Sequence, residues 1–73
     1  MSELILHNDD VNSATKVALA LVKYLDYELQ AAAQVLIITE GKGSCKIKEG
    51  DFIELYNLQN QFEDHNITTE LIA

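Results

Sequence analysis

The chain alternates between short apolar runs and polar breaks, and this pattern predicts six elements. Residues 3–7 form a short apolar run, which is typical of a buried strand. Residues 14–25 and about 27–40 repeat apolar side chains at three- and four-residue spacing, so each is expected to be a helix. Residues 44–48 alternate strictly between polar and apolar types, which predicts a half-buried strand. A third helix is expected from residue 52 to a turn at residues 64–66, followed by a last strand over residues 67–72.

Each helix is expected to bury one side. In the first helix the buried stripe consists of Val17, Ala18, Leu21, Val22, Tyr24 and Leu25. In the second it consists of Leu29, Ala32, Ala33, Leu36 and Ile37, and in the third of Phe52, Ile53, Leu55, Tyr56, Leu58 and Phe62. Asn12 or Ser13 is the expected N-cap of the first helix and Asp26 that of the second, because both residue types accept hydrogen bonds from free helix amides. Gly41 and Gly43 are expected to end the second helix.

The order β-α-α-β-α-β predicts an α+β fold. We expect a two-layer sandwich in which three helices pack on one face of a small, three-stranded, mostly antiparallel sheet. The 73 residues contain no proline and only three glycines, so residues 1–73 are expected to be a single domain. At this length only about 60% of the unfolded chain's surface is buried on folding, which makes a deep active-site cavity hard to accommodate.

The charge of the chain is strongly acidic and limits its partners. Twelve acidic residues face five bases, all of them lysine, for a net charge of −7. Nucleic acids and anionic membrane surfaces are therefore not expected partners, because both require a basic face. A cationic partner or a cationic group on a ligand is favoured instead.

The cysteine content and the terminal sequence predict a cytoplasmic protein. The single Cys45 cannot form an internal disulfide, which suits a reducing compartment. The N-terminus does not have the shape of a signal peptide, since Glu3 interrupts it early and the apolar run is short. No stretch approaches the roughly 20 apolar residues that span a bilayer.

The candidate chemistry lies where the first strand ends. Asn8, Asp9 and Asp10 follow the apolar run directly. They can form a turn by bonding their own backbone, as Asn and Asp often do. Alternatively, their oxygens can converge on an ammonium group, which has three donors and no acceptor. A third interpretation is Mg²⁺ or Ca²⁺ bound by Asp9, Asp10 and Glu40, but no glycine-spaced calcium loop is present, and we expect no metal or other cofactor.

No catalytic constellation is found in the sequence. Ser13, Ser44 and Cys45 lack a positioned base, and Cys45 is expected to point into the core. We therefore expect a binding protein and not an enzyme.

Residues 5–12 read Ile-Leu-His-Asn-Asp-Asp-Val-Asn and resemble the signature of the ClpS family, the adaptor of the ATP-dependent Clp protease. The resemblance covers nearly the whole chain. It includes apolar or aromatic residues at Val17, Leu21, Tyr24, Tyr27, Ala32 and Leu36, the glycine at Gly43 and the closing Thr69, Glu70 and Leu71. It implies N-end rule recognition, in which substrates with a hydrophobic N-terminal residue are bound and delivered to the N-terminal domain of a Clp ATPase.

The resemblance also implies the site residues. The free α-amino group would be held by Asn8 and Asp10, with Asp9 adjacent, and by the side chain at position 40. The pocket for the first side chain would be formed by Asn12, Ala14, Val17, Leu36, Thr39 and Ile67.

Several positions depart from the family pattern. Glu40 replaces a histidine, Ala14 replaces a methionine that gates the pocket, and Thr39 replaces a valine. We expect a wider and more polar pocket, with a carboxylate at position 40 that can accept from an ammonium as histidine does. Several residues are missing before the third helix, where the family carries part of its ATPase-binding surface, and the family's N-terminal extension is expected to be absent. A divergent interaction or regulatory domain that has lost N-terminal recognition is therefore the alternative hypothesis.

Overall fold

The computed structural model describes residues 1–9 and 11–73 and contains six elements in the predicted order. They are β1 (Ser2–His7), α1 (Ala14–Leu25), α2 (Leu29–Lys42), β2 (Ser44–Gly50), α3 (Phe52–Asp64) and β3 (Thr69–Ile72). The three helices and the three-stranded antiparallel sheet confirm the predicted α+β class. In the part of the chain that is described, no helix is both long and apolar enough to cross a membrane.

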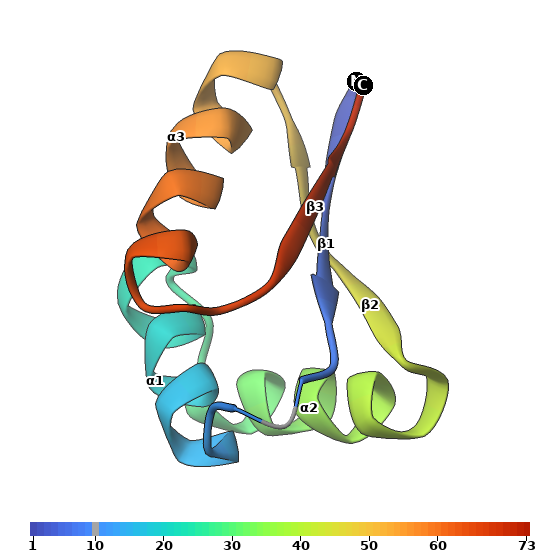
Figure 1. The fold of residues 1–73 in the computed structure, drawn as a ribbon, viewed down its shortest axis with the longest axis vertical. Coiled ribbons are helices and arrows are strands. Elements are labelled where there is room, and N and C mark those ends of the chain that lie inside the picture. Colours follow the sequence, from blue (N-terminus) through green and yellow to red (C-terminus); the bar gives the residue numbers. More distant parts are fainter. Residues whose placement is uncertain (10) are drawn as a thin grey trace.

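The sheet has β1 at its centre. The strand order is β2-β1-β3, and β1 pairs antiparallel with both neighbours (Figure 1). Leu6 lies opposite Cys45 on one side and Thr69 on the other, and the register with β2 shifts between Leu4 and Ile5. Leu4 and Leu6 are buried, as the alternation of side chains along a strand requires.

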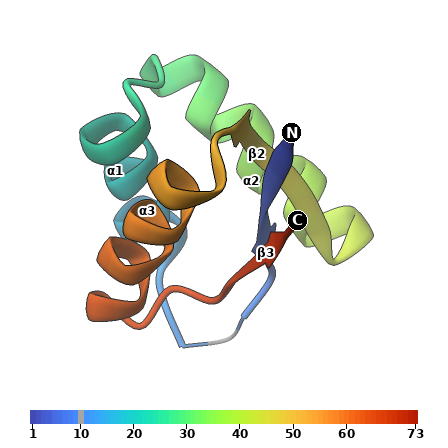
Figure 2. The same ribbon diagram turned by 90° about the horizontal axis from the view of Figure 1, so that it is seen from above.

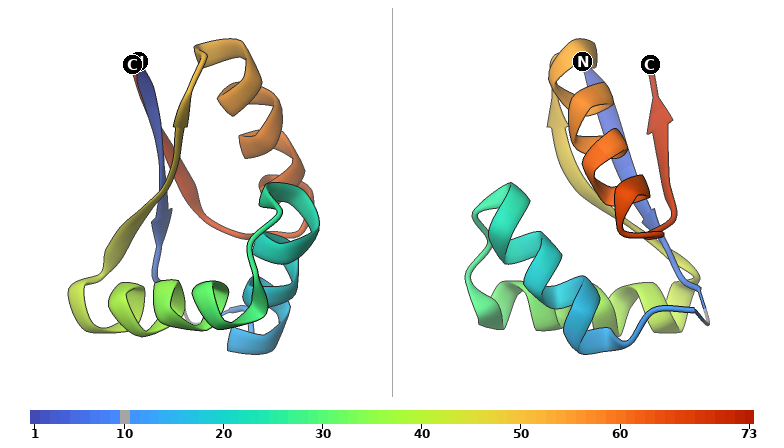
Figure 3. Two further views of the ribbon diagram at one scale, coloured as in Figure 1. Left: turned by 180° about the vertical axis from the view of Figure 1, so that it is seen from behind. Right: turned by 60° about the vertical axis from the view of Figure 1, so that its left-hand side comes forward.

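The helices cover one side and one end of this sheet, and they do not all run parallel to the strands (Figure 1 and Figure 2). Figure 1 shows α3 alongside the strands, while α2 runs across the end of the sheet where β1 finishes and β2 begins. Seen from above, α1 and α3 stand to one side of the strands (Figure 2). Figure 3 shows that α1 packs on α2 and against the C-terminal end of α3. The pocket described below therefore lies at the end of the sheet, where loops and helices meet.

The core is small, and both the helices and the sheet contribute side chains to it. The largest fully buried side chains are Leu4, Leu6, Leu21, Leu55, Phe62 and Ile67. Tyr24 of α1 packs edge-on against Phe62 of α3, with 5.8 Å between the ring centroids. This contact joins α1 to the helix that covers the sheet.

The predicted buried face of α2 is partly wrong. Leu29 and Ile37 are 63% and 65% exposed, and Ala33 is also exposed, whereas Val35 and Thr39 are buried beside Ala32. Nearly every side of α2 carries apolar residues, so spacing alone does not identify the side that faces the sheet.

The predicted buried face of α3 also needs correction. Phe52 and Tyr56 are half-exposed and stack on each other at 6.3 Å between ring centroids, and Ile53 is 67% exposed. Of the predicted residues, Leu55 and Phe62 are buried as expected, and they lie two turns apart and face the strands.

The helix ends agree with the predictions except at Asp26 and Gly41, since Gly41 lies inside α2, which continues to Lys42. Ser13 caps α1 by accepting a hydrogen bond from the amide of Lys16 at 3.2 Å, and Gly43 ends α2 with a φ of 89°. Asp26 does not cap α2. It ends α1 in the left-handed conformation, with a φ of 58°, and α2 begins later, at the N-cap Glu28. Aspartate tolerates this conformation better than most residues, which allows the tight connection between the two helices.

The two phenylalanines of α3 offer a matched test of this core. Phe62 is fully buried, whereas Phe52 is 47% exposed. Truncating a buried phenylalanine costs about 3–5 kcal/mol, a large share of the stability of so small a domain. In urea titrations, we expect Phe62→Ala to remove most of the free energy of unfolding. We expect Phe52→Ala to change that free energy by less than about 1 kcal/mol. Equal losses would contradict the placement of α3 on the sheet.

Candidate functional site

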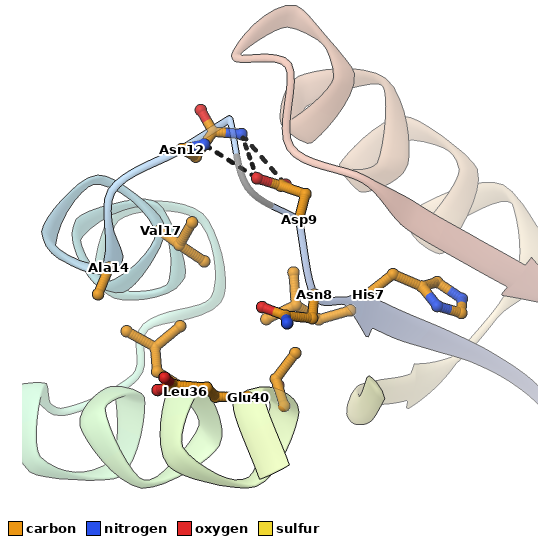
Figure 4. A pocket seen from close by; sticks show the side chains of 10 residues that line it. His7, Asn8, Asp9, Asn12, Ala14, Val17, Leu36 and Glu40 are labelled. Carbon is orange, nitrogen blue, oxygen red and sulfur yellow. Dashed lines mark hydrogen bonds between the residues drawn. The ribbon is translucent and has the colours of Figure 1, made fainter. Parts of the chain in front are cut away.

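A pocket of about 250 Å³ lies between the loop after β1, the start of α1 and the C-terminal half of α2 (Figure 4). Its lining residues are Leu6, His7, Asn8, Asp9, Asn12, Ala14, Val17, Leu36, Thr39 and Glu40. All of these except Leu6 and His7 are residues that the sequence assigned to the site. The fold therefore brings the two predicted groups, the polar loop and the apolar wall, to one place.

One predicted site residue, Asp10, lies outside the described residues. Another, Ile67, is not part of this lining. Ile67 is buried, with 1% of its surface exposed, but it borders a different groove along another face of α1. Its side chain belongs to the core between α1 and the turn after α3, and not to the pocket wall.

Leu6 and His7 were not assigned to the site from the sequence. Leu6 is the last core-facing residue of β1, so strand alternation already places it at the inner end of the pocket. The His7 ring points away from the pocket (Figure 4) and lies 2.9 Å from a carboxylate oxygen of Glu70 on β3.

Asp9 organises the loop. Its Oδ1 accepts hydrogen bonds from the backbone amides of Val11 and Asn12, both at 2.9 Å, and its carboxylate also contacts the Asn12 side chain (Figure 4). Partial burial opposes ionisation of Asp9, but the hydrogen bonds from Asn12 and Val11 outweigh it and lower the pKa of the carboxyl group below its ordinary value. Asp9 therefore forms the backbone-bonded turn, which is one of the three interpretations that the sequence offers for this stretch.

The loop is also tied to its surroundings. The amide of His7 donates to the carbonyl of Thr68 at 3.1 Å, and the amide of Asn8 donates to that of Gly43 at 2.9 Å. The Asn12 side chain donates to the carbonyl of Asn66 at 2.7 Å. These bonds fix the loop between the end of α2 and the turn after α3.

Among the described residues, the polar side chains available at the pocket are those of Asn8 and Glu40. Both are exposed, and Figure 4 shows them bordering the same space from the loop and from α2. An amide oxygen and a carboxylate are both hydrogen-bond acceptors, so this end of the pocket suits a ligand rich in donors.

The rest of the lining is mainly apolar. Leu6 and Val17 are buried, and Leu36 and Ala14 complete this side. The hydroxyl of Thr39 donates to the carbonyl of Val35 at 2.7 Å, so its polar group is already satisfied within α2 and adds little polarity. Threonine in place of the family's valine at position 39 therefore makes the pocket less polar than its residue type alone predicts.

The metal interpretation of the sequence includes Asp10, which lies outside the described residues. Within residues 1–9 and 11–73, no group of three His, Cys, Asp or Glu side chains is placed to hold a metal ion.

Comparisons with known proteins agree with this fold. The family model described as ATP-dependent Clp protease adaptor protein ClpS matches residues 1–70. Curated protein sequences give no significant match. Among solved structures, that of Agrobacterium tumefaciens ClpS2 bound to L-phenylalaninamide is similar, with a TM-score of 0.75 and 15% sequence identity. The alignment covers 96% of this chain and 94% of the other, which shows a shared fold. Because the family model spans nearly all of the sequence, the chain belongs to the ClpS family.

Proposed function

We propose that this Clp protease adaptor binds proteins by their N-terminal residue and presents them to the N-terminal domain of a Clp ATPase. The α-amino group is bound at the polar end of the pocket, and a hydrophobic first side chain fills the apolar end. One observation carries this proposal. A single pocket is lined by the hydrogen-bond acceptors Asn8 and Glu40 and by an apolar wall from β1, α1 and α2.

The polar end has the chemistry that an α-ammonium group requires. The ammonium has three donors and no acceptor, so it needs several oxygens. Asn8 and Glu40 supply two acceptors, and the resemblance to the family assigns a further one to Asp10. Glu40 adds a formal negative charge, and charge-assisted hydrogen bonds are roughly twice as strong as neutral ones. The net charge of −7 also favours the approach of a cation.

The whole pocket is of a size for a single N-terminal residue. At about 250 Å³, the pocket is smaller than the roughly 300–1,000 Å³ of sites for drug-sized ligands. Burying a Leu or Phe side chain contributes about 1.5–3 kcal/mol. The ligand in the similar ClpS2 structure, L-phenylalaninamide, combines a free amino group with such a side chain, which supports the same division of the pocket here.

The loop is held by hydrogen bonds within itself and to the rest of the chain. Asp9 Oδ1 already accepts hydrogen bonds from the backbone amides of Val11 and Asn12. We therefore assign Asp9 the role of positioning the loop, and not direct contact with the amino group. A loop that is ordered before binding loses less conformational entropy when the ligand arrives, and this raises affinity.

The alternative, a ClpS-fold domain without N-terminal recognition, is favoured by one structural feature. A single residue, Asp51, connects β2 to α3. This is the region where the family resemblance assigns part of the ATPase-binding surface, so the partner surface differs here.

The first prediction concerns the amino group of the ligand. A short peptide that begins with Phe is expected to bind, and its N-acetylated form is expected to bind at least about tenfold more weakly, because acetylation removes the charge and two donors. Isothermal titration calorimetry with both peptides measures the difference. Equal affinities would contradict amino-group recognition. Binding of neither peptide, together with no binding to the N-terminal domain of a Clp ATPase, would support the alternative.

The second prediction concerns Glu40. Glu40→Gln is expected to weaken binding of the Phe peptide about tenfold, since one charge-assisted hydrogen bond is lost. Glu40→His, which restores the family residue, is expected to bind more tightly than Glu40→Gln. Glu28→Gln is the matched control, because Glu28 is exposed at the other end of α2 and does not line the pocket. The same affinity for all variants would exclude Glu40 from the site.

The third prediction concerns the Asp9 turn. The pKa of Asp9 lies below its ordinary value of 3.8, so the ionised side chain stabilises the fold above that pH, and this contribution is lost as the pH falls through the folded pKa. Asp9→Ala is expected to lower the free energy of unfolding at pH 7 by about 1 kcal/mol and to weaken peptide binding. The stability difference from the unmodified protein should shrink towards pH 3.

Asp51→Ala is the control for this experiment. Asp51 is the N-cap of α3 but makes no capping hydrogen bond through its side chain. A larger loss for Asp51→Ala than for Asp9→Ala, or a loss for Asp9→Ala that stays constant with pH, would contradict the role of the Asp9 turn.

A further inference from the structure

A second groove, separate from the amino-group pocket, runs along another face of α1. It has a volume of about 400 Å³ and lies between α1 and the turn after α3. The residues that matter for its chemistry are Lys16, Leu19, Lys23, Tyr24, His65 and Ile67. The proposed function makes no use of this groove.

The floor of the groove is apolar. Ile67 is fully buried, Ala20 is buried, and Leu19 is 56% exposed. The Tyr24 hydroxyl and the His65 Nε2 are 2.7 Å apart and hydrogen-bond to each other, so their polar atoms are satisfied by one another. An apolar side chain can therefore lie here without leaving a buried polar group unpaired.

The rim of the groove is basic. Lys16 Nζ donates to the carbonyl of His65 at 2.8 Å, which uses one of its three donors, and Lys23 Nζ lies 5.4 Å from the centroid of the Tyr24 ring. Neither lysine forms an ion pair with a carboxylate of residues 1–9 or 11–73, whereas Lys46 and Lys48 are both paired with glutamates. None of the described residues that line the groove is acidic.

This arrangement is unusual for a chain with a net charge of −7. Most of such a surface repels an acidic ligand, but two lysines that have no carboxylate partner among residues 1–9 and 11–73 lie beside an apolar floor and attract one. Complementary charge gives such a contact its specificity, and the buried apolar side chain gives it affinity.

We propose that the groove is a docking site for a short acidic segment of a partner protein that carries a large apolar side chain. The apolar side chain packs against the exposed Leu19 over the apolar floor, and the flanking carboxylates pair with Lys16 and Lys23. These two lysines are two helical turns apart, which is about 10 Å along α1. About three residues of extended chain span that distance, so the acids are expected three positions apart, with the apolar residue between them.

Two acetylated peptides test this proposal on the full chain. The first is acetyl-Ser-Asp-Leu-Phe-Glu-Ser-amide, and the second has Asn and Gln in place of its two acids. Acetylation removes the amino group that the first pocket would bind, so the test is independent of the proposed function. In NMR titrations of the ¹⁵N-labelled protein, we expect the acidic peptide to shift the amides of Leu19, Tyr24 and His65, and to bind at least about fivefold more tightly than its neutral form.

Three variants make the test specific. Lys23→Glu is expected to weaken binding of the acidic peptide at least about fivefold. Lys42→Glu is the matched control, because Lys42 also lies in the last turn of a helix but does not border the groove. Leu19→Ser, which leaves all the charges in place, is expected to weaken the binding of both peptides.

Four results would overturn the proposal. They are the absence of shifts at the groove, equal affinity for the two peptides, equal loss for Lys23→Glu and Lys42→Glu, and shifts of the groove amides that grow with protein concentration in the absence of peptide. The last result would identify the groove as a contact between copies of this chain.

Discussion

The site depends on the double pairing of β1. This strand is bonded to β2 on one edge and to β3 on the other, and its inward residues Leu4 and Leu6 are almost completely buried. The strand therefore ends at a fixed point, beside the C-terminus of α2. The bond from the amide of Asn8 to the carbonyl of Gly43 carries this constraint one residue further, into the loop.

From that fixed point the polar stretch separates into two roles. Asp9 and Asn12 turn inward, where they bond the loop to itself and to the turn after α3. Asn8 remains exposed at the pocket, which it borders together with Glu40 of α2. A binding group on a short loop is positioned accurately only when such supporting bonds hold the loop, and here a rigid strand and a helix end provide them.

Most of the fold could be predicted because its signals are local. The spacing of Val17 and Leu21, the Ser13 cap and the glycine at position 43 all act within one turn of chain, and α1 begins and ends where the pattern places it. The face of α2 could not be predicted in this way, because Leu29 and Ile37 are as apolar as the residues that are buried. Only the position of the sheet decides which side is covered.

The site shows the same limit. Its lining could be anticipated from the family pattern, but Ile67 faces a different groove because the turn after α3 directs it towards α1. The role of Asp9 could not be read from residue type, since an aspartate in a loop can bond its own backbone or a ligand with the same oxygens. The amides that compete for those oxygens are visible only in the folded loop.

The central claim is that one pocket holds both an amino group and the side chain attached to it. Intermolecular nuclear Overhauser effects with L-phenylalaninamide test this claim directly. The account predicts contacts between the ring protons of the ligand and the methyl groups of Val17 and Leu36, which line the apolar end. Contacts confined to Leu19 and Tyr24 in the second groove, or the absence of any contact at saturating ligand, would contradict it.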